Sequence, residues 1–230
     1  MHLIASIPGG WNPDDEGVFH IQQSPGDIIY LSAADTELFS LREAWADLHQ
    51  HPEIFSKGDQ DSPNEAFPSL RLANLLYFKQ ELTIDTYLEE VVPHARLVVL
   101  RLLGGKAYFQ YLIEAFQAVC EDHGIPILFL PGYDTPDLEL MHCSSVPLEI
   151  VHQTWQYLAA GGSQNLRNCL KYLLDAFFSL KASVEPVVSI PDLFVDQAYE
   201  PIRSSGKPQV VILVSRTAKP RQNTKKRDAL

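Results

Sequence analysis

The chain has 230 residues, 46% of them hydrophobic and 10% aromatic, which supports a substantial core and excludes general disorder. Seven basic side chains and one acidic side chain give residues 207–230 a charge of +6, whereas residues 1–206, with 11 basic and 28 acidic side chains, carry −17. Such an acidic body repels phosphates, so we expect no nucleic-acid partner. No apolar run reaches membrane-spanning length, and the opening MHLIASIPGGW lacks the features of a signal peptide. The three cysteines form no CxxC pair and are expected to be reduced thiols. Together these features predict a cytoplasmic protein without a membrane partner.

Apolar periodicity alternates between strand and helix types along the first 135 residues. Short apolar runs predict strands at residues 2–7, 27–31, 70–75, 97–102 and 127–130. Helical spacing predicts helices over residues 36–48, from an N-cap at Thr83 to Pro93, and from Gly105 to His123. Within the third helix, the predicted buried stripe comprises Tyr108, Tyr111, Leu112, Ala115, Phe116 and Val119.

The sequence becomes helical in character after residue 136. We expect one helix over residues 147–159 and a second helix capped by Ser163, after Gly161 and Gly162. Residues 182–207 look extended, and residues 209–213 resemble a strand that begins another unit.

The expected domain organisation therefore has four parts. These are an α/β domain at residues 1–135, a helical pair at 136–181, an extended segment at 182–213 that starts a truncated next unit, and a disordered basic tail at 214–230.

Strands that alternate with helices predict an α/β fold with a doubly wound, mostly parallel, flavodoxin-like sheet and added helices toward the C-terminus. Ligands bind such sheets outside the carboxyl ends of the strands. The loops at 32–35, 104–106 and 131–134 follow predicted strands and are therefore the candidate binding loops.

The stretch RLLGGK is the most specific local signal. Its glycines would let the backbone approach a ligand, and a helix N-terminus beside Lys106 would favour an anion. We assign Arg101, Gly104 and Gly105 as residues of a ligand or partner loop. The stretch matches neither the P-loop nor GxGxxG, and a tight turn that needs positive φ is the preferred explanation of the glycines, with a ligand or partner contact as the alternative.

No complete catalytic or metal-binding constellation is recognisable. The chain contains neither HExxH nor GxSxG, and its histidines and cysteines lack the spacing of metal ligands. We assign no catalytic residue and no metal ligand.

Three stretches together resemble a known family. IIYLSAADTEL (28–38), PSLRLANLLYFKQELTIDTYLEEVVPHARLVVLRLLGGKAYFQY (68–111) and GGSQNLRNCLKYLL (161–174) are similar to the N-terminal region of the large subunit of aerobic cobaltochelatase, which is related to that of magnesium chelatase. Arg101, Gly104 and Gly105 match the family's RLLGG.

The resemblance implies a function in cobalamin biosynthesis. In that family the large subunit binds the tetrapyrrole hydrogenobyrinic acid a,c-diamide and Co²⁺, the metal that is inserted. Partner subunits of the AAA+ ATPase type hydrolyse ATP with Mg²⁺. We expect the chain itself to hold no firmly bound cofactor and to work with the remainder of the large subunit.

Two departures from the family leave alternatives open. Family members are far longer, and the basic end after PQVVIL (208–213) does not follow their pattern. We therefore expect a truncated or split gene product, inactive alone, so that its status as an enzyme is uncertain. The alternatives are a non-catalytic domain that binds tetrapyrrole or regulates chelatase assembly, and the magnesium chelatase counterpart, which acts on protoporphyrin.

Overall fold

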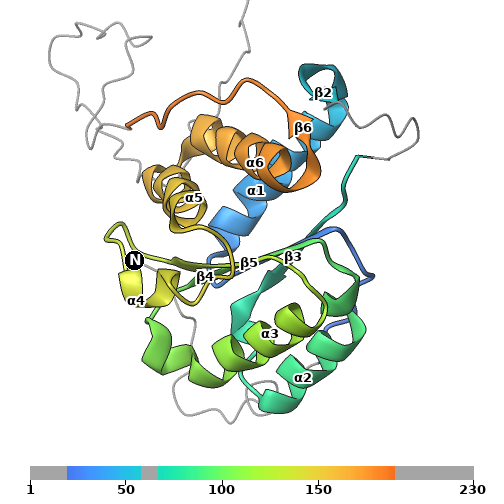
Figure 1. Ribbon diagram of the computed structural model, residues 1–230, viewed down its shortest axis with the longest axis vertical. Helices are drawn as coiled ribbons and strands as arrows, with labels where there is room; N and C mark the ends of the chain where they lie inside the picture. Colours follow the sequence, from blue (N-terminus) through green and yellow to red (C-terminus); the bar gives the residue numbers. More distant parts are fainter. Residues whose placement is uncertain (1–19, 58–66, 190–230) are drawn as a thin grey trace, which may run out of the picture. The chain divides into compact units, whose positions relative to one another are not determined.

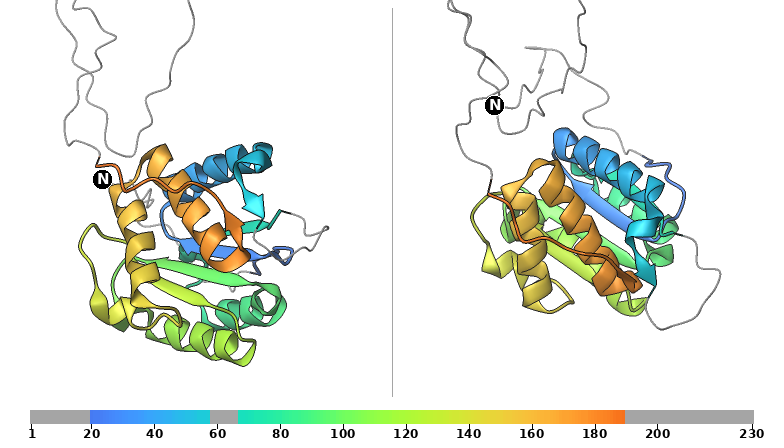
Figure 2. Two further views of the ribbon diagram at one scale, coloured as in Figure 1. Left: turned by 45° about the horizontal axis from the view of Figure 1, so that its top comes forward. Right: turned by 90° about the horizontal axis from the view of Figure 1, so that it is seen from above.

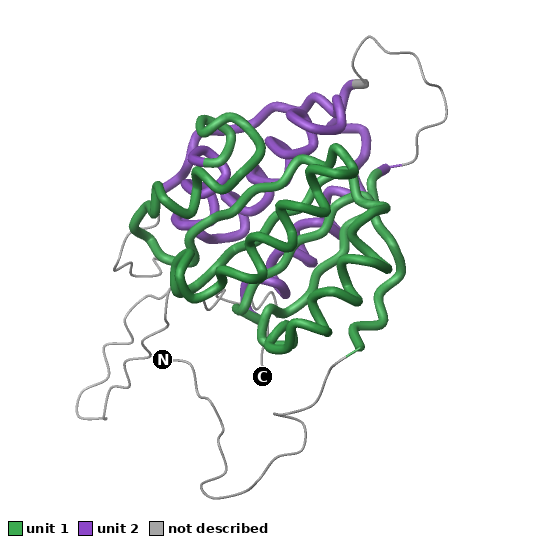
Figure 3. Tube along the Cα trace, turned by 60° about the horizontal axis from the view of Figure 1, so that its bottom comes forward, with its two compact units in different colours: residues 1–35, 68–151 green, residues 36–67, 152–230 purple. Residues whose placement is uncertain are grey.

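The computed structural model describes residues 20–57 and 67–189. Strands expected at 2–7 and 209–213, and the basic tail, lie outside these ranges. The chain divides into two compact units (Figure 3): unit 1 is Met1–Asp35 with Pro68–Val151, and unit 2 is Thr36–Phe67 with His152–Leu230. Each unit therefore combines segments that are distant in sequence. The boundaries expected at residues 135 and 181 stay predictions.

Unit 1 is built on a four-stranded parallel sheet (Figure 1). Its strands are β1 (Ile28–Ser32), β3 (Leu70–Asn74), β4 (Leu97–Leu102) and β5 (Ile127–Pro131), in the order β3-β1-β4-β5. Every residue of β1, β4 and β5 is buried, which explains why these strands appear in the sequence as continuous apolar runs. The predicted α/β fold with a parallel sheet is confirmed.

Two helices, α2 (Glu81–Glu90) and α3 (Gln110–Asp122), cover one face of this sheet (Figures 1 and 2). The core between them is formed by alternate strand residues and the inner faces of both helices, including Leu31, Leu100, Phe129, Leu88 and Phe116. A short helix, α4 (Leu138–Met141), follows β5. The expected cap of α2 is wrong: Gln80 precedes the helix, and Thr83 is buried inside it.

The predicted stripe on the third helix is wrong at its start. Tyr108 is 77% exposed and Tyr111 is 40% exposed. Residues Lys106–Phe109 form a 3-10 helix, which has about 3.0 residues per turn instead of 3.6 and so changes the phase of the pattern. The α-helix starts only at Gln110, and its buried face is Leu112, Ile113, Phe116 and Cys120.

Unit 2 is mainly helical and contains most of α1 (Asp35–Gln50), most of α5 (Leu148–Ala160) and all of α6 (Gly162–Phe178). The short strands β2 (Ser56–Lys57) and β6 (Leu180–Lys181) pair antiparallel. An ion pair of 2.8 Å between Arg167 and Asp47 joins α6 to α1. The cap of α6 is Gly161, with φ of 68°, so the expected cap at Ser163 is also wrong.

Candidate functional site

The strand order defines a switch point in unit 1. From β1 the chain moves to β3 on one side and then crosses back to β4 on the other side, so the direction reverses between β1 and β4. In open parallel sheets, ligands bind beside the carboxyl ends of the strands at this point. The structure brings the predicted loops 32–35, 104–106 and 131–134 to this edge, because β1, β4 and β5 are parallel neighbours. We call it the carboxyl edge.

A row of buried polar side chains lies at the carboxyl edge. Ser32 is in register with Asn74 on one side and with Arg101 on the other, and all three are buried. Asn74 donates to Asp35 Oδ1 at 2.5 Å and accepts from the Leu76 amide at 2.8 Å. Ser32 Oγ accepts from the Ala34 amide at 3.2 Å. The row therefore fixes the backbone where the chain leaves β1 and β3.

Arg101 performs the corresponding task for β5. It is 9% exposed, and its guanidinium donates to the carbonyl oxygens of Pro131 at 3.4 Å and Gly132 at 3.5 Å. Burial leaves little of Arg101 available to a ligand. Its position in the sheet makes it a residue that positions the 131–134 loop.

Backbone geometry requires both glycines of the RLLGGK turn. Gly104 has φ of 136° and Gly105 has φ of 75°. A Cβ on Gly104 would also lie 3.3 Å from the ring of Tyr108. The predicted anion site does not lie at the glycine turn. The N-terminus of α3 is at Gln110, and the 3-10 helix Lys106–Phe109 separates it from Gly105.

Gly132 belongs to the predicted 131–134 loop, but its close approach to the end of β4 was not predicted from the sequence. Its amide donates to the Leu102 carbonyl at 2.7 Å, and a Cβ at this position would lie 3.1 Å from the same oxygen. The loops after β4 and β5 therefore run in close contact, which no local motif indicates.

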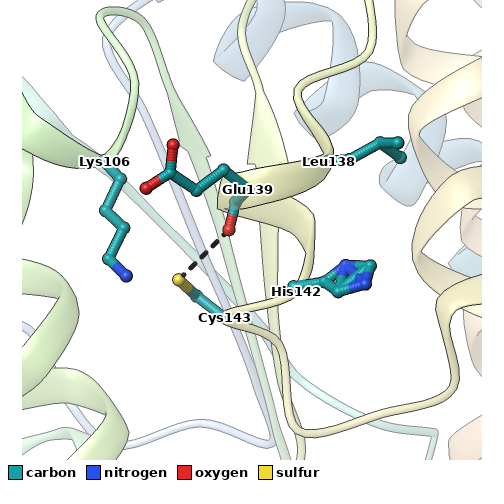
Figure 4. Close-up of a pocket in the computed structure, with 5 residues that line it drawn as sticks. All are labelled: Lys106, Leu138, Glu139, His142 and Cys143. Carbon is teal, nitrogen blue, oxygen red and sulfur yellow. Dashed lines mark hydrogen bonds between the residues drawn. The ribbon is translucent and has the colours of Figure 1, made fainter.

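A shallow depression of about 480 Å³ lies beside these loops and is lined by Lys106, Leu138, Glu139, His142 and Cys143 (Figure 4). The Cys143 thiol donates to the Glu139 carbonyl at 3.5 Å. The His142 ring points away from the other polar groups, so it is not placed to act as a base for the thiol. Among the described residues, no group of three potential ligands is arranged to hold a metal ion.

Exposed apolar side chains surround the carboxyl edge. They follow β3, β4 and β5 and are 46–77% exposed. We call them the apolar collar, and its members are Leu76, Tyr77, Leu103, Tyr108, Tyr133 and Leu138. Exposed apolar groups of this size that gather in one place are typical of binding surfaces. The sequence did not predict the collar, since Tyr108 was expected in the core.

The described part of unit 1 is an α/β unit with exposed apolar side chains at its carboxyl edge and without a recognisable catalytic constellation. No family model matches the chain. The chain is 38% identical to aerobic cobaltochelatase subunit CobN of Pseudomonas aeruginosa over 165 residues, which is 72% of this chain and 12% of the relative. It is 37% identical to the same subunit of Sinorhizobium sp. over 172 residues, again 12% of that protein.

A solved structure agrees with these sequence matches. The catalytic subunit of cobaltochelatase from Mycobacterium tuberculosis superimposes with a TM-score of 0.52 and 27% identity, over 73% of this chain and 12% of that protein. The resemblance to the large subunit of aerobic cobaltochelatase is thereby confirmed. The chain spans about an eighth of the length of the relatives it matches. The described part of the chain contains no helix long and apolar enough to cross a membrane.

Proposed function

We propose that this chain acts as the N-terminal segment of a cobaltochelatase large subunit in cobalamin biosynthesis, in the cytoplasm. In this proposal it works with the remainder of the large subunit and with AAA+ ATPase subunits. The complex inserts Co²⁺ into hydrogenobyrinic acid a,c-diamide and uses ATP with Mg²⁺. The similarity to two cobaltochelatase subunits over about three quarters of the chain supports this assignment.

We propose further that the carboxyl edge of unit 1 contacts the corrin. The observation that carries this proposal is the apolar collar at the switch point of a parallel sheet. A corrin diamide combines a broad apolar ring with carboxylate side chains. Tyr108 and Tyr133 offer exposed rings for the macrocycle, and the exposed Lys106 offers a cation for a carboxylate.

The predicted loop residues then have separate roles. Gly104 and Gly105 give the backbone the conformation that presents Lys106 and Tyr108. Arg101 holds the neighbouring loop through the Pro131 and Gly132 carbonyls. Ring chemistry and metal insertion are assigned to the polypeptide outside this segment, so we place no catalytic residue here.

A titration of the 230-residue chain with hydrogenobyrinic acid a,c-diamide, followed by the corrin absorbance and by tryptophan fluorescence, tests the proposal. We expect saturable binding in the micromolar range, and weaker binding of protoporphyrin. Removal of one stacking aromatic ring costs about 0.5–1.5 kcal/mol, so Tyr108→Ala should raise the Kd about 2- to 13-fold.

Ile54→Ala is the matched control, because Ile54 is an exposed apolar residue of unit 2 outside the collar. An equal rise in the Kd for Tyr108→Ala and Ile54→Ala would refute the assignment of the apolar collar as the corrin-binding surface. Stronger binding of protoporphyrin would favour the magnesium chelatase counterpart. Binding of neither ring by a folded chain would refute a tetrapyrrole surface here.

A further inference from the structure

A second recognition surface lies in unit 2, where the segment after β6 runs back over α6 towards α5 (Figure 2). Residues 183–188 of this segment form no strand or helix. Ser183, Glu185 and Val188 are exposed. Of the helix side chains that meet them, Tyr157, Asn165 and Asn168 are buried and Lys171 is half-buried. Most of the hydrogen bonds that hold the segment go to its main-chain atoms, and one goes to a side chain, from Gln164 Nε2 to the Glu185 carboxylate at 2.5 Å.

Asn165 of α6 makes the strongest contact. Its Nδ2 donates to the Val188 carbonyl at 2.7 Å, and its Oδ1 accepts from the Val188 amide at 2.9 Å. One side chain thus satisfies both main-chain groups of one residue, as a neighbouring strand would do. The same Nδ2 also donates to the Gly161 carbonyl at 2.7 Å, which fixes the rotamer.

Three further side chains continue the pattern towards the start of the segment. Asn168, one turn after Asn165, accepts from the Glu185 amide at 3.5 Å, and the Tyr157 hydroxyl of α5 donates to the Glu185 carbonyl at 2.6 Å. Lys171 donates to the Ser183 carbonyl at 3.3 Å. Helix positions 165, 168 and 171 therefore meet segment positions 188, 185 and 183 in order.

Asn168 provides independent evidence that the face of α6 next to segment 183–188 binds main-chain groups. The residue is buried, and its Nδ2 has no hydrogen-bond partner in the described part of the chain. Buried amide donors are nearly always satisfied, so the two N–H groups of this nitrogen can still donate to a main-chain acceptor or a water molecule.

We propose that Tyr157, Asn165, Asn168 and Lys171 form a clamp that recognises extended polypeptide backbone, and that its occupant is this chain's own segment 183–188. The contacts that the clamp makes at Val188, Glu185 and Ser183 go to main-chain atoms, so the clamp does not select the side chains of Val188 and Ser183. The Glu185 carboxylate accepts a separate hydrogen bond from Gln164. The clamp fixes the point from which the chain continues beyond residue 189. This inference is independent of tetrapyrrole binding.

Hydrogen exchange of the full chain, read by mass spectrometry on peptides covering 181–189, tests the clamp. We expect protected amides in this segment. Val188→Pro removes the amide that donates a hydrogen bond to Asn165 Oδ1. This variant should accelerate exchange of the remaining amides of the segment about tenfold or more. Val187→Pro is the matched control, because it places the same ring one residue away from the clamped amide and should accelerate exchange much less.

Two further variants separate backbone recognition from side-chain packing. Val188→Ser keeps the main-chain groups and should retain protection, whereas Asn165→Ala should lose it while amides inside α6 stay protected. Unprotected segment amides in the unmodified chain would overturn the proposal. Equal acceleration of exchange by Val187→Pro and Val188→Pro would also overturn it. So would faster exchange in Val188→Ser.

Discussion

Replacing Gly104 with asparagine tests whether the RLLGGK turn depends on its unusual backbone. Asparagine tolerates the left-handed region near φ of 60°, but Gly104 has φ of 136°, which lies outside it. The new Cβ would also lie 3.3 Å from the Tyr108 ring. Holding a non-glycine residue in such a region costs about 1–3 kcal/mol, and we expect unfolding free energy to fall by this amount.

The same substitution at Gly124 is the control. Gly124 has φ of 64°, and a Cβ there would meet nothing within 4 Å. Asparagine is common at such helix ends, so Gly124→Asn should cost less than about 1 kcal/mol. Urea denaturation followed by far-UV circular dichroism measures both variants. Equal losses at the two positions would refute the claim that Gly104 is required by its conformation.

Four other predictions concern the core and the carboxyl edge of unit 1. Phe116→Ala removes a fully buried ring between the sheet and α3 and should cost about 3–5 kcal/mol in urea denaturation, whereas a loss below about 1 kcal/mol would contradict the described core. Arg101→Met leaves the Pro131 and Gly132 carbonyls without this donor and should cost about 1–3 kcal/mol, with faster hydrogen exchange in loop 131–134; unchanged exchange there would contradict its positioning role. Burial raises the pKa of the Cys120 thiol to about 12, so alkylation of the native chain at pH 8 should label the partly exposed Cys143 well before Cys120. Because the unfolded thiol ionises near pH 9 and the native thiol does not, stability should fall between pH 9 and 12, and Cys120→Ala should remove that part of the pH dependence.

The sequence predicted the sheet well for a physical reason. Strands buried on both faces must be apolar throughout, and LVVLRL at 97–102 coincides with β4 residue for residue. The ends of helices were predicted less well. Thr83 and Ser163 are good capping residues in isolation, but Gln80 and Gly161 take those positions because the preceding turns end earlier.

The candidate site could be predicted only in part. Arg101, Gly104 and Gly105 stand out locally, and the structure places them at the switch point. The apolar collar could not be predicted, because its members come from loops after three strands whose order depends on long-range pairing. Tyr108 shows the difficulty most clearly: its helical spacing matches a buried stripe, and one 3-10 turn moves it to the surface.

Hydrogen exchange of the 230-residue chain with and without hydrogenobyrinic acid a,c-diamide tests the central claim most directly. The account predicts slower exchange in peptides covering residues 103–109 and 132–138, with protoporphyrin giving a weaker effect. Segment 183–188, which belongs to the clamp, should not change. Unchanged exchange at the carboxyl edge at saturating corrin, or protection confined to other segments, would contradict a tetrapyrrole-binding role for this surface.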